Sequence, residues 1–300
     1  MTLAIAQYVT SFEALDRQLA YESISDDPEN YHRCVARERT LEIEACRQVG
    51  IPCFLILDTP ETQRIRMIGH GQDQFRRHLL FDSERNPVDS LAGYEVLLRT
   101  CVSHEQSPLE FIEAMGGVNV ADWASQVKTQ EWYKHVRPEY LKRKMAWFPL
   151  DQAPDLSGFK VDGQFFAKTS FKAISGVTDS LLSLLGYEVE MMPPGTEIIV
   201  SEPIRLPTDA RGKREYRCFV VRKISSISRY IDYDTAYEIP GEVEEFATAF
   251  IADHQGVLPE CYVLDVAESD RGLVVIELNG IVASGRYERN CFRKLLGDLR

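Results

Sequence analysis

The sequence lacks the features that mark several common classes of protein. Its seven cysteines form no Cys-x-x-Cys pair and have no metal-type spacing, so we expect reduced core thiols rather than disulfides or a metal cluster. No basic region followed by a long apolar one stands at the N-terminus, and no apolar run approaches the length of a membrane span. These absences predict a cytoplasmic protein that does not contact a membrane.

Motifs of dinucleotide and nucleophilic chemistry are also missing. Gly69-His70-Gly71 is followed neither by a further glycine at dinucleotide spacing nor by Gly-Lys-Ser/Thr, which predicts a plain turn. No Gly-x-Ser-x-Gly elbow occurs, and the six histidines are scattered without metal spacing. An activity of this chain therefore has to come from other residues.

Basic residues are fewer than acidic ones, with 34 lysines and arginines against 46 aspartates and glutamates, and the net charge is −12. This balance argues against broad binding to nucleic acid, because such binding needs a basic surface. The one basic cluster, between Lys134 and Lys144, is interleaved with aromatic residues and could bind RNA or an acidic partner. We favour the alternative of a solvated helix face whose aromatic residues point inward.

The composition that is present suits two folded domains, since the 300 residues are 44% hydrophobic and 27% charged. Apolar residues recur at helical spacing over 29–49, Gly50 is a natural stop, and an apolar strand follows over 51–57. Helix, glycine and strand in this order are typical of an α/β layer. Because Pro149 to Gly158 has the composition of a linker, we predict an N-terminal α/β domain over 1–150, which could bind substrate.

The second half predicts mostly strands with two helices. A short helix is expected from Asp179 to Leu185, and a longer one has its apolar face from Val243 to Ile251 and ends at Gly256. Strands are expected over 164–168, 197–204, 216–222, 224–231, 261–268 and 273–280. This half is therefore expected to be an α+β unit.

Polar groups interrupt the apolar strands near the C-terminus. Arg217 and Asp265 each lie within an apolar run, and Glu277 and Asn279 lie at the end of the last strand. A charge in such a run is costly unless another group pairs it. Carboxylate and amide oxygens bind Mg²⁺ and a guanidinium binds phosphoryl oxygens, so together these residues predict a nucleotide-phosphate site.

The register of the last hairpin decides whether its two carboxylates meet. If Asp270-Arg271-Gly272 forms a three-residue loop, Ser269 pairs with Leu273 and Asp265 lies opposite Glu277. A four-residue loop would shift the pairing by one residue and separate the carboxylates. The metal site thus requires an odd register or a β-bulge. The simpler alternative is that each polar group has its own hydrogen-bond partners near the turn and that no metal binds there.

A series of short motifs extends over the second half. They are Lys168 before a small-residue loop, the strand 198–203, Glu215-Tyr216-Arg217, Ser228-Arg229-Tyr230, Asp265, and Glu277-x-Asn279 followed by Ser284-Gly285. In order and spacing they resemble the ATP-grasp superfamily, over about residues 158–290. More narrowly they are similar to its divergent bacterial and phage branch, which is akin to the eukaryotic cell-division-cycle factor that assembles a translation initiation complex. The N-terminal half matches no family that we can name.

The resemblance implies an α+β ATP-grasp fold over 158–300, with ATP clamped between a small lid subdomain (158–204) and a metal and phosphate subdomain (205–300). Lys168 would reach the α- and β-phosphates, and Lys172 would be a second phosphate or lid contact with a catalytic role. Taken alone, each lysine is equally well interpreted as a solvated loop residue.

The same resemblance implies roles for other residues of this half. The strand Val200-Ser201-Glu202 would meet adenine through its backbone, and Glu202 would hold a ribose hydroxyl. Arg217 and Arg229 would neutralise the γ-phosphate in the transition state. The ligands of one or two Mg²⁺ ions would be Asp265, Glu277 and Asn279.

Two further expectations concern the surroundings of this site. A buried Arg217 needs an anion, and Glu215 could supply part of that pairing. Arg286 and Tyr287, just past the metal strand, could contact a carboxylate substrate or simply pack.

Typical ATP-grasp proteins join a carboxylate to an amine through an acylphosphate, so the resemblance implies an ATP-dependent ligase with Mg²⁺ as cofactor. Its substrates would be small-molecule or peptide carboxylates and amines. Two alternatives stay open: an ATP-binding assembly factor with little turnover, and a phosphotransferase on the same fold. The oligomeric state is open as well, a homodimer included.

Overall fold

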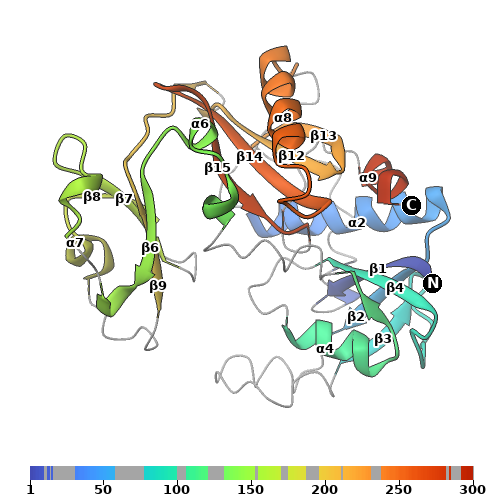
Figure 1. Cartoon of the computed structure of the whole chain (residues 1–300). Coiled ribbons are helices and arrows are strands. Elements are labelled where there is room, and N and C mark those ends of the chain that lie inside the picture. Colours follow the sequence, from blue (N-terminus) through green and yellow to red (C-terminus); the bar gives the residue numbers. More distant parts are fainter. Residues whose placement is uncertain are drawn as a thin grey trace.

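The computed structural model describes residues 1–9, 12–13, 15, 31–57, 78–99, 106–120, 132–152, 155–169, 175–186, 196–210, 212–230, 238–281, 284 and 292–299. Three mixed groups of strands and helices lie side by side, as Figure 1 shows. Across these ranges, no helix combines the length and the apolar character that crossing a membrane requires.

The first group is a five-stranded sheet with the order β3-β2-β1-β4-β5. All neighbours are parallel except β2 and β3. Its strands are β1 (Thr2–Val9), β2 (Cys53–Leu57), β3 (Leu79–Asp82), β4 (Tyr94–Arg99) and β5 (Val118–Asn119), and its helices are α2 (Tyr31–Val49) and α4 (Gln106–Ala114). The predicted helix, glycine and strand are confirmed, and Gly50 has the positive φ of +71° that stops the helix.

The second group, which we call the C-terminal sheet, has the order β13-β12-β14-β15 with antiparallel neighbours throughout. Its strands are β12 (Glu215–Val221), β13 (Lys223–Arg229), β14 (Cys261–Ser269) and β15 (Gly272–Asn279). Helix α8 (Gly241–Asp253) covers one face, where Phe250 joins a core with Cys218 and Leu264. These strands and this helix confirm the sequence expectation.

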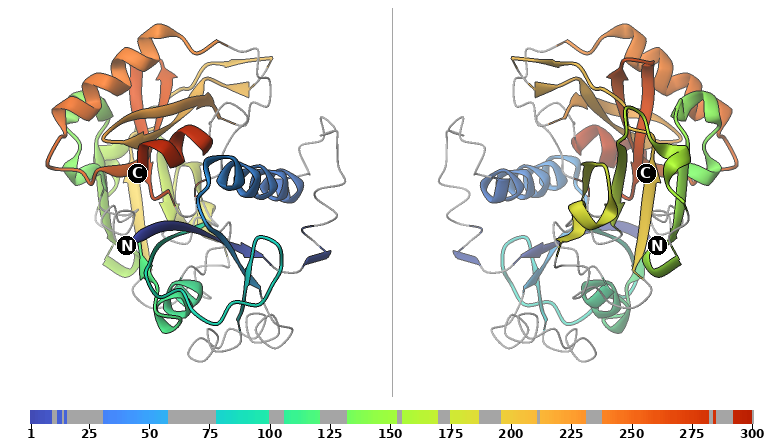
Figure 2. Two further views of the ribbon diagram at one scale, coloured as in Figure 1. Left: turned by 90° about the vertical axis from the view of Figure 1, so that its right-hand side faces the viewer. Right: turned by 90° about the vertical axis from the view of Figure 1, so that its left-hand side faces the viewer.

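The opposite face of the C-terminal sheet divides into two parts. Near one end, Phe219 and Val263 join the core of the N-terminal sheet. Helix α2 lies between the two sheets, and the last helix, α9 (Phe292–Leu299), packs against it, as Figures 1 and 2 show. The other end of this face is polar and carries the site described below.

The third group, which we call the lid sheet, has the order β6-β9-β7-β8. Its elements are β6 (Met145–Pro149), β7 (Phe165–Thr169), β8 (Ser175–Thr178), β9 (Glu197–Ser201) and α7 (Leu181–Leu185). Phe165 and Val200 contribute to its core. Strand β9 ends two residues before Pro203, as the proline predicts.

Strand β6 bears on the predicted domain boundary at residue 150. It precedes that boundary, yet it pairs with β9, which follows it. Before β6, the 3₁₀ turn η3 (Trp132–His135) and helix α6 (Pro138–Leu141) pack on the C-terminal sheet. The predicted linker itself holds the 3₁₀ turns η4 (Leu150–Gln152) and η5 (Ser157–Phe159). We therefore propose that the boundary lies before Trp132.

A buried polar cluster ties the N-terminal sheet to the segment that follows β15. Arg99 donates to both carboxylate oxygens of Glu42, at 3.1 and 2.8 Å, and to the backbone oxygens of Ile281 and Ser284. Gln7 donates to the same carboxylate at 2.7 Å. The N-terminal half therefore holds the chain immediately after Asn279.

The cysteine prediction is confirmed for the four thiols that the structure describes. Cys46, Cys53, Cys218 and Cys261 are free and buried. Burial raises the pKa of Cys261 to about 12, so this thiol stays protonated and unreactive at neutral pH.

Candidate functional site

A pocket of about 500 Å³ lies between the lid sheet and the C-terminal sheet, and we call it the intersheet pocket. Phe166, Lys168 and Ser201 line it from the lid sheet. Glu215 and Glu277 line it from the C-terminal sheet. The pocket is thus formed by both halves of the predicted clamp.

The last hairpin brings its two carboxylates together by a different route from the predicted one. Ser269 pairs with Gly272, one residue earlier than the three-residue loop predicted, and Gly272 has a φ of +82°. This register alone would separate the carboxylates. A β-bulge between Asp265 and Val266 shifts it back and places Asp265 opposite Glu277. The predicted loop register is therefore wrong, and the alternative of a bulge is confirmed.

Arg217 pairs with Asp265 across strands β12 and β14. The guanidinium donates through Nε and Nη2 to the two carboxylate oxygens, at 2.9 and 2.8 Å. The side chains are 7% and 0% exposed, so water screens the pair weakly. Arg217 was expected to need an anion, with Glu215 as part of the pairing; its hydrogen-bonded anion is Asp265, and Glu215 interacts with it through charge.

Lys168 and Asn279 connect the remaining carboxylate to this pair. The ammonium of Lys168, which comes from the lid sheet, donates to Oε2 of Glu277. The amide of Asn279 donates to Asp265 Oδ2 at 3.2 Å and to Glu277 Oε1 at 2.9 Å. These hydrogen bonds join Lys168, Glu277, Asn279, Asp265 and Arg217 into one network. Its members Lys168 and Glu277 line the pocket, whereas Arg217, Asp265 and Asn279 are buried and are not among the lining residues.

Glu215 belongs to the same face of the C-terminal sheet, two residues before Arg217 on β12. Burial, and then the charges of Asp265 and Glu277, raise its pKa to about 7, while the charge of Arg217 opposes them. Sequence analysis noted this residue only as a partner for Arg217. Its position two residues before Arg217 on the same strand, and hence on the same face, was the signal that could have placed it in the site.

The predicted adenine strand has one residue that faces away from the pocket. Val200 is buried in the core of the lid sheet, and its neighbours Ser201 and Glu202 line the pocket. The carboxylate of Glu202 accepts a hydrogen bond of 2.8 Å from Arg271 on the β14–β15 turn. This bond lowers the pKa of Glu202, so the carboxylate is charged at neutral pH.

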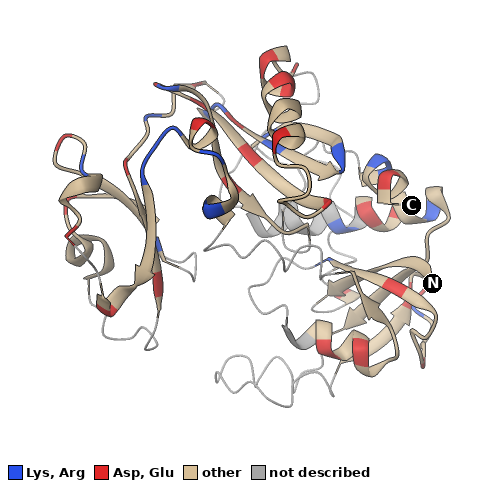
Figure 3. Ribbon diagram, in the orientation of Figure 1, with Lys and Arg blue, Asp and Glu red and all other residues tan. Residues whose placement is uncertain are grey.

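Arg143 corrects the interpretation of the basic cluster as a solvated helix face. Its side chain is half-buried, lines the pocket and donates to the backbone oxygens of Val275 and Ile276 at 2.9 and 3.0 Å. Burial, and then the charge of Arg271, lower its pKa to about 10. Trp132 and Tyr140 of this cluster do point into the core, as expected. Figure 3 shows the basic residues following the segments that join the two sheets.

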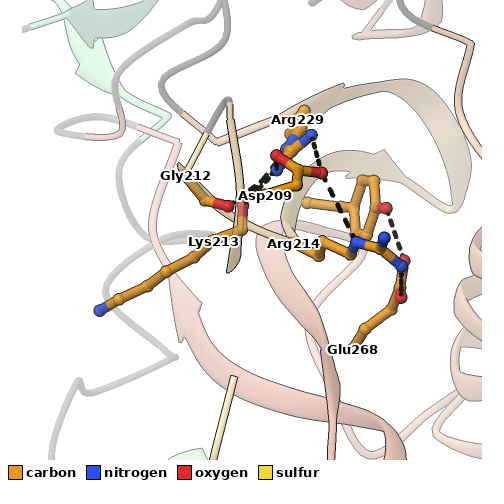
Figure 4. A network of polar contacts seen from close by, with 7 residues as sticks. Asp209, Gly212, Lys213, Arg214, Arg229 and Glu268 are labelled. Carbon is orange, nitrogen blue, oxygen red and sulfur yellow. Dashed lines mark hydrogen bonds and ion pairs between the residues drawn. The ribbon is translucent and has the colours of Figure 1, made fainter. Parts of the chain in front are cut away.

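Arg229, which was predicted to be catalytic, is bound to the hairpin over 208–213 and not to the carboxylates of the Arg217 network in the described part of the chain. It pairs with Tyr216 on β12, and because successive strand residues point to opposite faces, it lies on the face away from Arg217. Its guanidinium is 1% exposed and binds both carboxylate oxygens of Asp209, at 3.1 and 2.7 Å, as Figure 4 shows. Arg229 is thus a structural tie rather than a group that can reach a phosphate.

Several predicted residues lie outside the described part of the chain. They are Lys172, Gly285, Arg286, Tyr287 and the Gly69-His70-Gly71 turn. Their roles stay predictions.

The candidate metal ligands are two carboxylates and an amide. Among the described residues, no group of three or more His, Cys, Asp or Glu side chains is placed to share a metal ion. Asp265 and Glu277 nevertheless offer hard oxygen atoms within one hydrogen-bonded network, which is the donor chemistry that Mg²⁺ accepts, and Asn279, whose amide nitrogen faces both carboxylates, would turn its oxygen to the metal. This set would leave the remaining coordination positions to water and substrate oxygens.

Comparison with known proteins agrees with this arrangement. The D-alanine–D-alanine ligase of Bacillus anthracis, solved with ATP, superimposes with a TM-score of 0.56 at 12% identity and covers 99% of this chain and 95% of that chain. VanG D-Ala:D-Ser ligase from Enterococcus faecalis gives a TM-score of 0.55 at 14% identity, covering 100% and 98%. At these identities the likeness shows the ATP-grasp fold alone. No curated protein sequence matches the chain.

The family assignment comes from the sequence of the second half together with α4 and the segment that follows it. Residues 110–299, more than half of the chain, match the ATP-grasp domain of the R-two-K clade, family 3. This range begins before the 158–290 over which the motifs were noticed and includes β6, which pairs into the lid sheet. The chain therefore belongs to the ATP-grasp proteins, in family 3 of that clade.

Proposed function

We propose that the intersheet pocket binds ATP with Mg²⁺ and that the protein is an ATP-dependent carboxylate–amine ligase. The family and the fold support this proposal, since the similar structures include ligases and one of them was solved with ATP. A cytoplasmic location is part of the same proposal.

The observation that carries the proposal is the charge-neutral network that begins with the pocket-lining pair of Lys168 and Glu277 and extends from it to buried Asp265 and Arg217. Lys168 and Arg217 each hold one carboxylate there, Glu277 and Asp265 respectively. Asp265, Glu277 and Asn279 would hold Mg²⁺, which would neutralise phosphate charge. Lys168 and Arg217 would then turn from the carboxylates to the phosphoryl oxygens. Lys168 and Arg217 balance Glu277 and Asp265 before this exchange, and two Mg²⁺ ions would balance the charge of ATP after it, so the site is prepared for a charged ligand.

The other contacts follow from the lining of the pocket. We propose that adenine lies against Ser201 and Glu202, with Val200 contributing only backbone groups. Lys172 would add a phosphate contact from the lid. Arg286 and Tyr287 would meet the carboxylate substrate.

The chemistry needs no protein nucleophile. A carboxylate oxygen of the substrate attacks the γ-phosphorus and ADP leaves, and then the amine nitrogen attacks the acyl carbon, phosphate leaves and the amine loses a proton. Positioned cations stabilise the transferring phosphoryl group, which is the main catalytic contribution in such reactions. Arg217 and Lys168 are the residues that we assign to this role.

A release assay tests the proposal. The purified chain is incubated with ATP, Mg²⁺ and pools of carboxylates and amines that include short peptides, and ADP and phosphate are measured. Release is expected only when both a carboxylate and an amine are present, and Lys168→Gln should abolish it. The control is Lys223→Met, which removes an exposed lysine of the C-terminal sheet that is not among the pocket-lining residues, and it should behave as the wild type. ATP consumption that is indifferent to both substrates would contradict a ligase.

The same assay distinguishes the alternatives. The narrower kinship with the eukaryotic assembly factor would be supported by tight ATP binding, no turnover with any pool and a co-purifying protein. A phosphotransferase would release ADP with an acceptor alone and leave the phosphoryl group on that acceptor.

A further inference from the structure

Lys213 differs from the other cations that line the intersheet pocket. Lys168 is bound to Glu277, and Arg143 donates to backbone oxygens. The ammonium of Lys213 makes no hydrogen bond or ion pair with any residue of the described ranges, although its charge lowers the pKa of Glu215. Within those ranges it is the lining cation that a ligand could reach without displacing a partner.

Strand pairing and side-chain hydrogen bonds hold the backbone around Lys213 in place. Lys213 closes the two-stranded hairpin of β10 (Thr208–Asp209) and β11 (Gly212–Lys213). The buried guanidinium of Arg229 binds Asp209 and also donates to the carbonyl oxygens of Gly212, at 3.0 Å, and Lys213, at 3.2 Å. Five donated hydrogen bonds therefore converge on the hairpin from one side chain.

The neighbouring residues extend this tie into the C-terminal sheet. Arg214 forms ion pairs with Asp209, at 3.5 Å, and with Glu268, at 2.9 Å. Glu268 also accepts a hydrogen bond of 2.8 Å from the hydroxyl of Tyr216. Figure 4 shows the Lys213 side chain extending away from this network. Hydrogen bonds therefore hold the backbone of Lys213, while its ammonium can bind a ligand.

We propose that Lys213 binds a phosphate oxygen of the nucleotide in the intersheet pocket and that Arg229 is a positioning residue that acts through Lys213. The proposal rests on the proposed function, because it needs a nucleotide in that pocket. Burying an arginine is costly unless anions and acceptors surround it, and here Asp209 and the carbonyl groups of Gly212 and Lys213, all on the hairpin that carries Lys213, are among them. Arg229 thus acts on the pocket from the opposite face of the C-terminal sheet, by fixing the hairpin that carries Lys213.

The test of Lys213 compares a loss of charge with its retention. The dissociation constant of ATP with Mg²⁺ is measured by calorimetry for the wild type, Lys213→Gln and Lys213→Arg. Lys213→Gln should raise it about 10-fold, the effect of one charge-assisted hydrogen bond, and Lys213→Arg should stay within about threefold of the wild type. Unchanged affinity in Lys213→Gln, or an equal loss in both variants, would overturn the proposal.

The role of Arg229 is tested by non-additivity. Arg229→Met should weaken ATP binding in the wild-type background but cause little further loss in Lys213→Gln, because the two residues act in series. Should Arg229→Met fail to fold, Asp209→Asn loosens the same tie from a residue whose side chain is one-third exposed. A purely structural role predicts the same loss in both backgrounds, and that result would overturn the positioning role.

Failure of this inference differs from failure of the proposed function. If the wild type does not bind ATP with Mg²⁺, the proposed function and the role of Lys213 are both contradicted. If the wild type binds and Lys213→Gln binds equally well, only the role of Lys213 is lost. Lys223→Met again serves as the control for removal of an exposed lysine.

Discussion

Arg217 and Asp265 face each other on neighbouring strands and form a two-pronged ion pair with N···O distances of 2.9 and 2.8 Å. Both side chains are shielded from water. A buried pair of this kind contributes little net stability by itself, but removing one partner leaves an uncompensated charge in a medium of low polarity. The pair is therefore a point where the fold and the proposed chemistry depend on the same two residues.

We expect Arg217→Met to lower the free energy of unfolding by about 3–5 kcal/mol, because Asp265 would stay buried without its cation. The double variant Arg217→Met with Asp265→Leu should lose less than the sum of the two single variants. Urea unfolding of the three variants measures this coupling. Additive losses would mean that the pair is not the energetic unit described here.

Glu215 should make stability depend on pH. Its pKa is raised from 4.5 to about 7 in the folded protein, so the folded state binds the proton more tightly than the unfolded state. The stabilisation is fully present below the unfolded pKa and is lost as the pH rises through about 7. Between pH 5 and pH 8, Glu215→Gln should therefore lose about 2 kcal/mol less than the wild type in urea unfolding. Parallel pH profiles for the two proteins would contradict the raised pKa.

The residues of this network illustrate what a sequence can and cannot predict. Asp265, Glu277, Asn279 and Arg217 were identifiable because a charge inside an apolar strand has to be paired. The bulge after Asp265 that brings the carboxylates together has no residue signature in the sequence, since it is fixed by the pairing of whole strands.

Other residues escaped prediction because their surroundings come from distant segments. The half-buried Arg143 binds carbonyl groups of β15, more than 130 residues away, so its local sequence suggested a solvated helix. Arg229 was expected at the phosphates because the spacing of its motif resembles the family pattern. Its place on the opposite face follows from the register with β12 and not from composition. The fold was predicted better than the site, since strands and helices depend on local periodicity.

Arg271 is expected to restrain the lid. It donates to Glu202 at 2.8 Å and to the backbone oxygen of Lys142 at 2.7 Å, which are on the two segments joining the lid sheet to the C-terminal sheet. Arg271→Met should change the free energy of unfolding by less than about 1 kcal/mol, because the pair is partly exposed. Amide hydrogen exchange over 142–144 and 202–205 should nevertheless become faster.

The matched control for this variant removes an exposed ion pair elsewhere. Arg222→Met breaks the pair with Glu260 at the β12–β13 turn, at side-chain exposures of 71% and 65%. It should leave exchange in the two joining segments unchanged. Equal exchange in Arg271→Met and Arg222→Met would show that Arg271 does not restrain the lid.

Calorimetric titration of ATP with Mg²⁺ into the wild type and Glu277→Gln tests the central claim most directly. The claim is that Glu277 lies where the metal and the lid lysine meet, so the wild type should bind one ATP per chain and Glu277→Gln should bind none, with the circular dichroism spectrum unchanged. Equal affinity for ATP in the two proteins would contradict the claim and remove the site from this pocket.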